Sequence, residues 1–407
     1  MKSAYKRKLS YNERLYVAGD RVSAPVVNQF VFDGSGVLDP ALWRDAVRKA
    51  SEANPGARVV LKGVLGWSRW RDSGISPPVV ELDGAQWKWN SPEGIPPHLK
   101  TTFDVRKGPT CEVALVHGEP LRVVFRTHHG VMDGMGTFIW AEDICRALRG
   151  EPLLGSDSAM TDLEICRSQQ KEYRTPFPFD NLSASGKADG TETGVTYFRM
   201  SREGKFHNLL GQAAILAARE AWKHGPGKVR FSVPVDMRRH LQGVRSTANL
   251  TMPIYIEVTE ASTPEEIAQS VKEQLEKKRE CLIDREDPLL NYVPMAAIAR
   301  RWKKLVRVYH EKGLYRTSGV ISNVGKIPPM PLFSGGGFQA RHFWAIPPAY
   351  DNIPLFIGLA SSGNMLEVIT SMPKVLATKG RIEQTTENIL AGLIPVSPSR
   401  VERPGVA

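Results

Sequence analysis

Two adjacent histidines, followed at short spacing by an aspartate and a glycine, form the stretch of this chain best suited to chemistry. The run HHGVMDG spans His128 to Gly134. An imidazole exchanges protons near neutral pH, so it can act as a general base on a hydroxyl or an amine, and it can also bind a metal ion. Adjacent side chains on an extended segment point in opposite directions. We therefore expect only one of the two histidines to face a site.

Three interpretations of this run stay open on the residues alone. A metal site is one, but no second cluster of His, Asp or Glu follows at metal-ligand spacing, and we expect no metal. A packed histidine pair beside a helix cap is another. In the third, His129 is a general base and His128 packs. Asp133 could cap the following helix or pair with a distant arginine, and Gly130, Gly134 and Gly136 would allow tight turns and close approach of a ligand.

A strand and a helix must position these residues. The segment from Leu121 to Arg126 is rich in β-branched residues and is expected to pair antiparallel with Thr110 to Val116. After the run, apolar residues recur at helical spacing as far as Leu148, and Arg149-Gly150 is a typical helix end. The histidines thus lie at a strand-to-helix junction, where rigid neighbours can hold an exposed group.

The rest of the chain predicts an α+β fold in two parts. With 407 residues the chain is long for one ordinary core. We expect a first lobe over 1–155, a crossover over 156–192, where Pro, Ser, Gly and Asp accumulate, and a second lobe over 193–407. Strand patterns with covering helices recur in both lobes, which indicates mixed or antiparallel sheets.

Composition indicates a water-soluble protein whose positive charge either serves anionic partners or forms a basic solvated surface. The four cysteines are scattered without a CxxC pair, which argues against a zinc cage or a disulfide framework. No apolar run reaches membrane-spanning length, and no apolar signal core follows the basic N-terminus, so we expect a cytoplasmic protein. The formal net charge of +11 favours nucleic acid, acidic lipid, coenzyme A phosphates or an acidic carrier protein without choosing among them.

The run from His128 to Gly134 resembles the HHxxxDG signature of the chloramphenicol acetyltransferase-like superfamily. That superfamily includes nonribosomal peptide condensation domains, polyketide-associated acyltransferases, BAHD acyltransferases and wax ester synthases. Three further segments resemble the same proteins: FDVRKGP before the strand pair, VPVDMR ending at Arg238, and ISNVG around Ser322 and Asn323. The DFGWG motif of BAHD enzymes does not occur, which argues against a plant-type enzyme.

The resemblance implies a fold and roles for individual residues. It implies a pseudo-dimer of two acetyltransferase-like lobes, with the active site in a channel between them. His129 would be the general base, while His128, Asp133 and Gly134 would be structural, and backbone amides near Gly134 are candidates for binding the oxyanion. We expect a salt bridge from Asp133 to Arg238 that links the two halves.

The resemblance also implies an activity and its co-substrates. A freestanding acyltransferase would move an acyl group from a thioester, on coenzyme A or a carrier-protein phosphopantetheine arm, to a hydroxyl or amine acceptor without an acyl-enzyme. Ser322 and Asn323 could line the channel, or be ordinary polar residues at a strand end. The alternatives are a condensation-type synthase acting on carrier-bound substrates and a catalytically silent scaffold that binds a carrier protein. We expect no bound cofactor, a small-molecule acceptor, an acyl or peptidyl carrier as a candidate partner, no nucleic acid, and a monomer.

Overall fold

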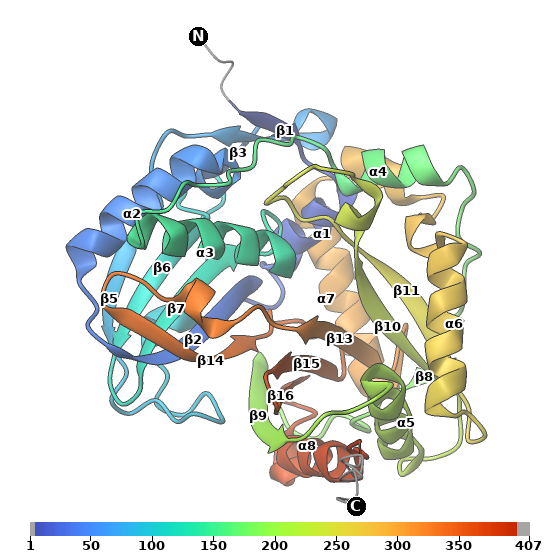
Figure 1. Cartoon of the computed structure of the whole chain (residues 1–407). Helices are drawn as coiled ribbons and strands as arrows, with labels where there is room; N and C mark the ends of the chain where they lie inside the picture. Colours follow the sequence, from blue (N-terminus) through green and yellow to red (C-terminus); the bar gives the residue numbers. More distant parts are fainter. Residues whose placement is uncertain (1–4, 397–407) are drawn as a thin grey trace, which may run out of the picture.

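Two separate β-sheets with helices packed on them divide the chain into two lobes (Figure 1). The structure is a computed structural model that describes residues 5–396. Each lobe has its own hydrophobic core, one built around Phe125 and Trp140 and the other around Phe231 and Ile357. The expected α+β class with mixed sheets is confirmed.

The first lobe contains a five-stranded mixed sheet with the order β14-β2-β7-β6-β5. Its pairs are antiparallel except β5 and β6, which run parallel. A small sheet of order β1-β4-β3 lies beside it. The strands of this lobe are β1 (Lys6–Lys8), β2 (Val27–Gly36), β3 (Val59–Lys62), β4 (Arg69–Asp72), β5 (Val79–Asp83), β6 (Cys111–His117), β7 (Leu121–His128) and β14 (Phe338–Ile346).

The second lobe is built on a six-stranded sheet with the order β11-β10-β13-β15-β16-β9. A two-stranded ladder of β8 and β12 adjoins it, where the Leu182 amide donates to the Lys228 carbonyl just before β10. These strands are β8 (Asn181–Leu182), β9 (Val195–Glu203), β10 (Val229–Asp236), β11 (Thr251–Val258), β12 (Leu314–Tyr315), β13 (Gly319–Lys326), β15 (Phe356–Ser362) and β16 (Met365–Pro373).

Helices cover the sheets and bridge the lobes (Figure 1). Helices α2 and α3 pack on each other over the first sheet, α5, α6 and α8 lie on the second, and α1 packs against α7. The helices are α1 (Tyr11–Gly19), α2 (Pro40–Ala53), α3 (Gly134–Leu148), α4 (Asp162–Gln169), α5 (Leu209–Trp222), α6 (Pro264–Glu276), α7 (Met295–Lys312) and α8 (Arg381–Gly392). None of the helices within residues 5–396 combines the length and the apolar character needed to cross a bilayer.

Two segments cross the expected lobe boundaries. Strand β14, in the range expected for the second lobe, pairs with β2 over eight registered positions and so completes the first sheet. Residues 156–192, expected to be a crossover, carry α4 and β8. In addition, Met295, Ile298 and Ala299 of α7 belong to the hydrophobic core of the first lobe. The first lobe is therefore completed by β14 and by the start of α7, which come from the later part of the chain.

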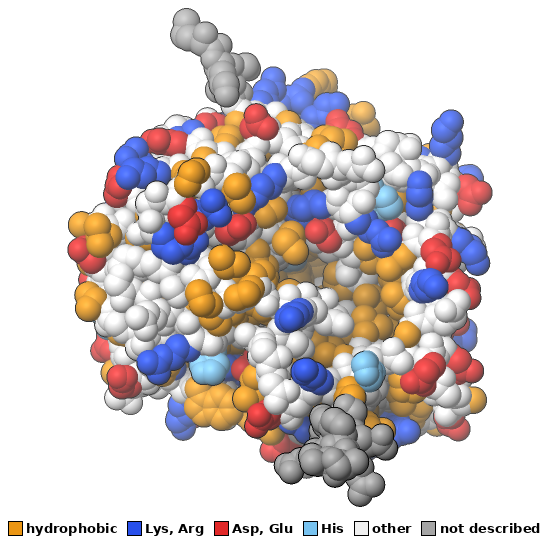
Figure 2. Space-filling view, in the orientation of Figure 1, with side chains coloured by type: hydrophobic (Ala, Val, Ile, Leu, Met, Phe, Trp, Pro, Cys, Tyr) orange, Lys and Arg blue, Asp and Glu red, His pale blue; other side chains and the backbone are white. Residues whose placement is uncertain are grey.

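The second sheet opens where it approaches the first lobe. Strand β13 pairs with β10 only at Gly319 and Val320, and beyond that point it keeps β15 as its partner. Figure 2 shows a hollow between the two lobes, with hydrophobic side chains in its depth. An opening at this position gives a small molecule access to the ends of strands from both lobes.

Candidate active site

The histidine run lies where strand β7 ends and helix α3 begins, as expected. Strand β7 ends at His128 and α3 begins at Gly134. The His128 side chain is fully buried, whereas His129 is partly exposed. Of the two imidazoles, that of His129 is therefore the one a ligand can reach.

The loop holds the His129 imidazole in one orientation. Its Nδ1 lies 3.2 Å from the Met132 carbonyl oxygen, and the ring stacks on Tyr16 of α1, with centroids 4.4 Å apart. The side chain of Asn249 donates from Nδ2 to the backbone oxygen of His129 at 2.5 Å. Asn249 Nδ2, which can only donate, lies 3.3 Å from the same Nδ1, but the Met132 carbonyl, which can only accept, is nearer. Its contact favours the tautomer with the proton on Nδ1 and with Nε2 as the basic nitrogen.

Burial sets the charge of His129. It lowers the pKa of the imidazole below its ordinary value, and the nearby Asp133 carboxylate and the Met132 carbonyl offset this only in part. The ring is therefore neutral at pH 7. A neutral imidazole with a free Nε2 can accept a proton from a hydroxyl or an amine.

The His128 side chain is buried and contacts the turn after β7. Its Nδ1 accepts a hydrogen bond from the Gly130 amide at 3.0 Å, which closes the turn after β7. Burial lowers its pKa to about 4, so it stays neutral. Its Nε2 is buried and has no hydrogen-bond partner among residues 5–396.

Asp133 is both a helix cap and an ion-pair partner, so the two alternatives for this residue occur together. Its Oδ1 accepts from the Gly136 amide at 2.7 Å, which caps α3. Both carboxylate oxygens lie 3.0 Å from nitrogens of Arg238. Although burial favours the neutral acid, the guanidinium and the backbone amides hold the pKa of Asp133 below its usual range.

The partners of Asp133 come from the second lobe. Besides Arg238, its Oδ2 accepts from the Leu250 amide at 2.7 Å and from the Thr251 hydroxyl at 3.0 Å. Arg238 also donates to the carbonyls of Ser246 at 2.9 Å and Ala248 at 2.6 Å. The loop that carries His129 is thus fastened to the end of β10 and the start of β11.

The glycines of this region are required for close packing, and their backbone angles are ordinary. Gly130, Gly134 and Gly136 lie outside the left-handed region. A Cβ on Gly136 would stand 2.3 Å from the carbonyl oxygen of Thr247 in the second lobe. On Gly134 it would meet the Phe30 ring at 3.3 Å. Gly130 lies in the tight turn after β7, as expected, whereas Gly134 and Gly136 lie where the core and the second lobe fill the space a side chain would need.

A buried ion pair supports the same loop from the N-terminal side. Arg7 pairs with Glu13, and both side chains are almost entirely buried. Arg7 also donates to the carbonyl oxygen of Val131 at 3.2 Å. Sequence reasoning missed this support, because a short basic strand followed by one glutamate carries no signal of burial.

Three other neighbours of His129 were not identified from the sequence. They are Tyr16, Asn249 and Tyr350, whose ring centroid lies 6.3 Å from that of His129. The Tyr350 hydroxyl is buried without a hydrogen-bond partner among the described residues. Each of the three lies more than 100 positions from His129 along the chain, so no local spacing could reveal the contact.

Ser322 and Asn323 lie on β13, in the part that has left β10. Ser322 is half-buried, and Asn323 is exposed with its Oδ1 accepting from the Gly325 amide at 3.0 Å. None of the hydrogen bonds within residues 5–396 joins either side chain to His129. Their position at the opening of the second sheet leaves a channel-lining role as a prediction.

A cavity of about 680 Å³ lies between the lobes close to the histidine loop. Gln29 of the first lobe and Tyr197 and Ser371 of the second lobe line it, together with Pro25 and Ala349. Val26, which follows the lining residue Pro25, accepts a hydrogen bond at its carbonyl oxygen from the His129 amide at 3.0 Å. Ala349, another lining residue, directly precedes Tyr350. His129 itself is not among the residues that line the cavity, so the cavity adjoins the histidine loop only through these neighbouring segments. Its volume suits a small-molecule ligand.

Solved structures with this arrangement of lobes cover almost the whole chain. The starter condensation domain of rhizomide synthetase RzmA, in a double mutant in a "product-released" conformation, has a TM-score of 0.62 at 14% identity, over 95% of this chain and 94% of that one. The condensation domain of Monacolin K polyketide synthase MokA has a TM-score of 0.59 at 11% identity, over 95% and 96%. The chain has the condensation-domain fold.

This fold is shared by proteins with different names. The epimerization domain from the third module of tyrocidine synthetase B has a TM-score of 0.58 at 13% identity, over 96% of this chain and 97% of that one. No protein-family model and no curated protein sequence matches the chain. The two-lobed fold expected from the HHxxxDG resemblance is confirmed, and at these identities the likeness extends to the fold alone.

Proposed function

We propose that this protein is an acyltransferase that moves an acyl group from a thioester to a hydroxyl or amine acceptor. The observation that carries the proposal is the His129 imidazole, partly exposed between the lobes, with Nδ1 close to the Met132 carbonyl and Nε2 without a hydrogen-bond partner among residues 5–396. The condensation-domain fold and the adjoining cavity support the same activity.

His129 acts as the general base in one displacement. Its Nε2 takes the proton of the acceptor while the acceptor oxygen or nitrogen attacks the thioester carbonyl carbon. The tetrahedral oxyanion then collapses, the carbon–sulfur bond breaks, and the thiolate leaves with the proton that His129 accepted. Positioning and proton transfer suffice, so no acyl-enzyme forms. Asp133 and Arg238 hold the loop and do not touch the reacting atoms.

The donor is coenzyme A or the phosphopantetheine arm of a carrier protein, both of which carry phosphates. The net charge of +11 favours such donors. Helix α7 presents an exposed basic face made of Arg300, Arg301, Lys303, Lys304 and Arg307. One neighbour, the starter condensation domain of rhizomide synthetase, is described in complex with C8-CoA. We assign the α7 face to docking of the donor or its carrier.

A panel of thioesters tests the proposal. Acyl-coenzyme A and acyl-carrier donors of varied chain length are incubated with hydroxyl and amine acceptors, and thiol release and product mass are recorded. Acyl transfer predicts stoichiometric thiol and an ester or amide product. Turnover of carrier-bound donors only would favour the condensation-type alternative. Epimerization would change the configuration of a substrate with no thiol released, and that result would overturn the proposal.

The scaffold alternative makes a different prediction. A catalytically silent protein would bind a carrier but release no thiol with any donor. Replacing Lys303 and Lys304 on α7 by glutamate tests docking separately. These two substitutions should raise KM for the donor and leave kcat nearly unchanged, because the helix face lies outside the residues that surround His129. Substitution of two exposed lysines elsewhere, Lys272 and Lys277, is the matched control.

A further inference from the structure

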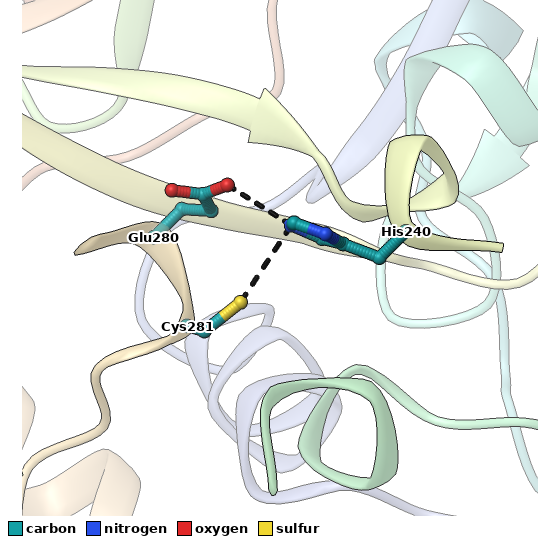
Figure 3. Close-up of side chains that lie close together, drawn as sticks. All are labelled: His240, Glu280 and Cys281. Carbon is teal, nitrogen blue, oxygen red and sulfur yellow. Dashed lines mark hydrogen bonds and ion pairs between the residues drawn. The ribbon is translucent and has the colours of Figure 1, made fainter. Parts of the chain in front are cut away.

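Three side chains with metal-binding atoms meet in the second lobe, apart from the histidine loop. They are His240, Glu280 and Cys281 (Figure 3). His240 ends the short 3-10 helix Met237–His240, which follows β10, and the other two lie in the 3-10 helix Arg279–Cys281, which follows α6. His240 Nε2 lies 3.0 Å from a Glu280 oxygen and 3.7 Å from the Cys281 sulfur, and all three ligand atoms lie within 4.8 Å of one another.

Glu280 has a carboxylate oxygen that the described residues leave unsatisfied. The side chain is fully buried, and Oε2 has no hydrogen-bond partner within residues 5–396. Its other oxygen, Oε1, takes the contact with His240 and lies 3.9 Å from Arg239. A buried carboxylate is costly unless its oxygens are paired or bound to a cation. Figure 3 shows this oxygen on the side of the carboxylate turned away from His240 and Cys281, so a rotation of the carboxylate would bring it to a cation held between the three side chains.

We propose that His240, Glu280 and Cys281 form a binding site for a divalent cation of the zinc class. Zinc takes nitrogen, carboxylate oxygen and thiolate ligands, whereas calcium and magnesium prefer oxygen alone. Metal–ligand distances of about 2.0 to 2.3 Å place tetrahedral ligand atoms about 3.4 to 3.6 Å apart. The separations of 3.0 and 3.7 Å from His240 bracket that range, and the third pair of ligand atoms lies within 4.8 Å. Side-chain shifts would therefore bring three ligands into place, with a water as the fourth.

A bound ion would connect the 3-10 helices Met237–His240 and Arg279–Cys281 next to the salt bridge between the lobes. His240 stands two residues after Arg238 in the same 3-10 helix, and the other two ligands anchor the chain after α6. A bound ion would thus stabilise the turn that supplies Arg238 to Asp133. The role is structural, and the inference does not rest on the proposed acyltransferase activity.

The metal content of the purified protein tests this inference directly. The protein is produced with zinc in the medium, kept under reducing conditions because Cys166 belongs to the same buried cluster as Cys281, and dialysed against metal-free buffer. Elemental analysis should find about one zinc per chain. Titration of the apoprotein with Co²⁺ should produce thiolate-to-cobalt charge-transfer absorption, and zinc should raise the thermal midpoint of the apoprotein.

Matched variants separate this site from unspecific binding. Cys281→Ser should abolish the charge-transfer absorption, and His240→Gln should lower the affinity for Co²⁺ at least about tenfold, a loss in the range for disturbed metal sites. Cys145→Ser, a buried thiol elsewhere, and His207→Gln, an exposed imidazole, should change neither. Where Cys281→Ser or His240→Gln fails to fold, Glu280→Gln, which keeps the size of its side chain, should lower the affinity for Co²⁺ and keep the charge-transfer absorption. A wild-type protein that retains no zinc and shows no charge-transfer absorption with Co²⁺ would overturn the inference.

Discussion

Replacing Asp133 by asparagine should weaken the joint between the lobes more than any change of similar size at the surface. The carboxylate accepts from Gly136, Leu250, Thr251 and both terminal nitrogens of Arg238. Asparagine keeps the size and one accepting oxygen. It removes the negative charge and turns an NH₂ group towards donors that need an acceptor.

The magnitude follows from the burial of the pair. The side chains of Arg238 and Asp133 are 9% and 2% exposed. Removing one partner of a buried ion pair costs about 3 to 5 kcal/mol, because it leaves an uncompensated buried charge. Arg238 keeps a second carboxylate, Asp236, at 2.7 Å. We therefore expect the lower end of the range for Asp133→Asn, about 3 kcal/mol, which is more than a hundredfold in the folding equilibrium.

Urea unfolding followed by tryptophan fluorescence measures this loss, since the chain has nine tryptophans. Asp236→Asn is the matched control, because it removes a carboxylate from the same guanidinium but from a side chain that is 37% exposed. An exposed pair is worth about 1 kcal/mol or less. Equal shifts in the two variants, or a shift below about 1 kcal/mol for Asp133→Asn, would refute the assignment of Asp133 as the interlobe fastening.

Three further results are expected. Gly136→Ala should lower the thermal midpoint and the rate of thiol release together, because its Cβ would stand 2.3 Å from the Thr247 oxygen; an unchanged melting curve would contradict the packing argument. Acid should destabilise the protein through His128. Because the pKa of His128 is about 4 in the folded state and higher in the unfolded state, the unfolded state binds more protons below about pH 6.5. The free energy of unfolding should therefore fall by up to about 3 kcal/mol between about pH 6.5 and pH 4. His128→Asn should flatten the pH dependence of urea midpoints in that window, and parallel curves would argue against it. The rate of thiol release should rise with pH through an apparent pKa below the ordinary histidine value and then level off, because burial lowers the pKa of His129; a rise centred above pH 7 would assign the base to another group.

The sequence predicted those parts of the fold that local patterns specify. The hairpin of β6 and β7 and the helix that ends at Leu148 both occur where spacing and residue type placed them. Each depends on residues a few positions apart. The resemblance to HHxxxDG proteins added the long-range pair of Asp133 and Arg238, which no periodicity contains.

The remaining features depend on contacts between distant segments. Nothing in the pattern of β14 distinguishes a strand of the second sheet from one that crosses to β2 of the first. The stacking of Tyr16 on His129 joins α1 to the end of β7, and Asn249 reaches the same loop from the second lobe. Tertiary packing decides such contacts, so the sequence could suggest a candidate site but could not identify the residues that surround His129.

The rate of thiol release by His129→Ala, on the best donor and acceptor of the thioester panel, tests the central claim most directly. General-base catalysis contributes about a hundredfold or more, so we predict at least that loss in kcat. Donor binding and the thermal midpoint should stay close to those of the wild type, because the partly exposed ring closes no part of the core. A His129→Ala protein that turns over at the wild-type rate would contradict the account.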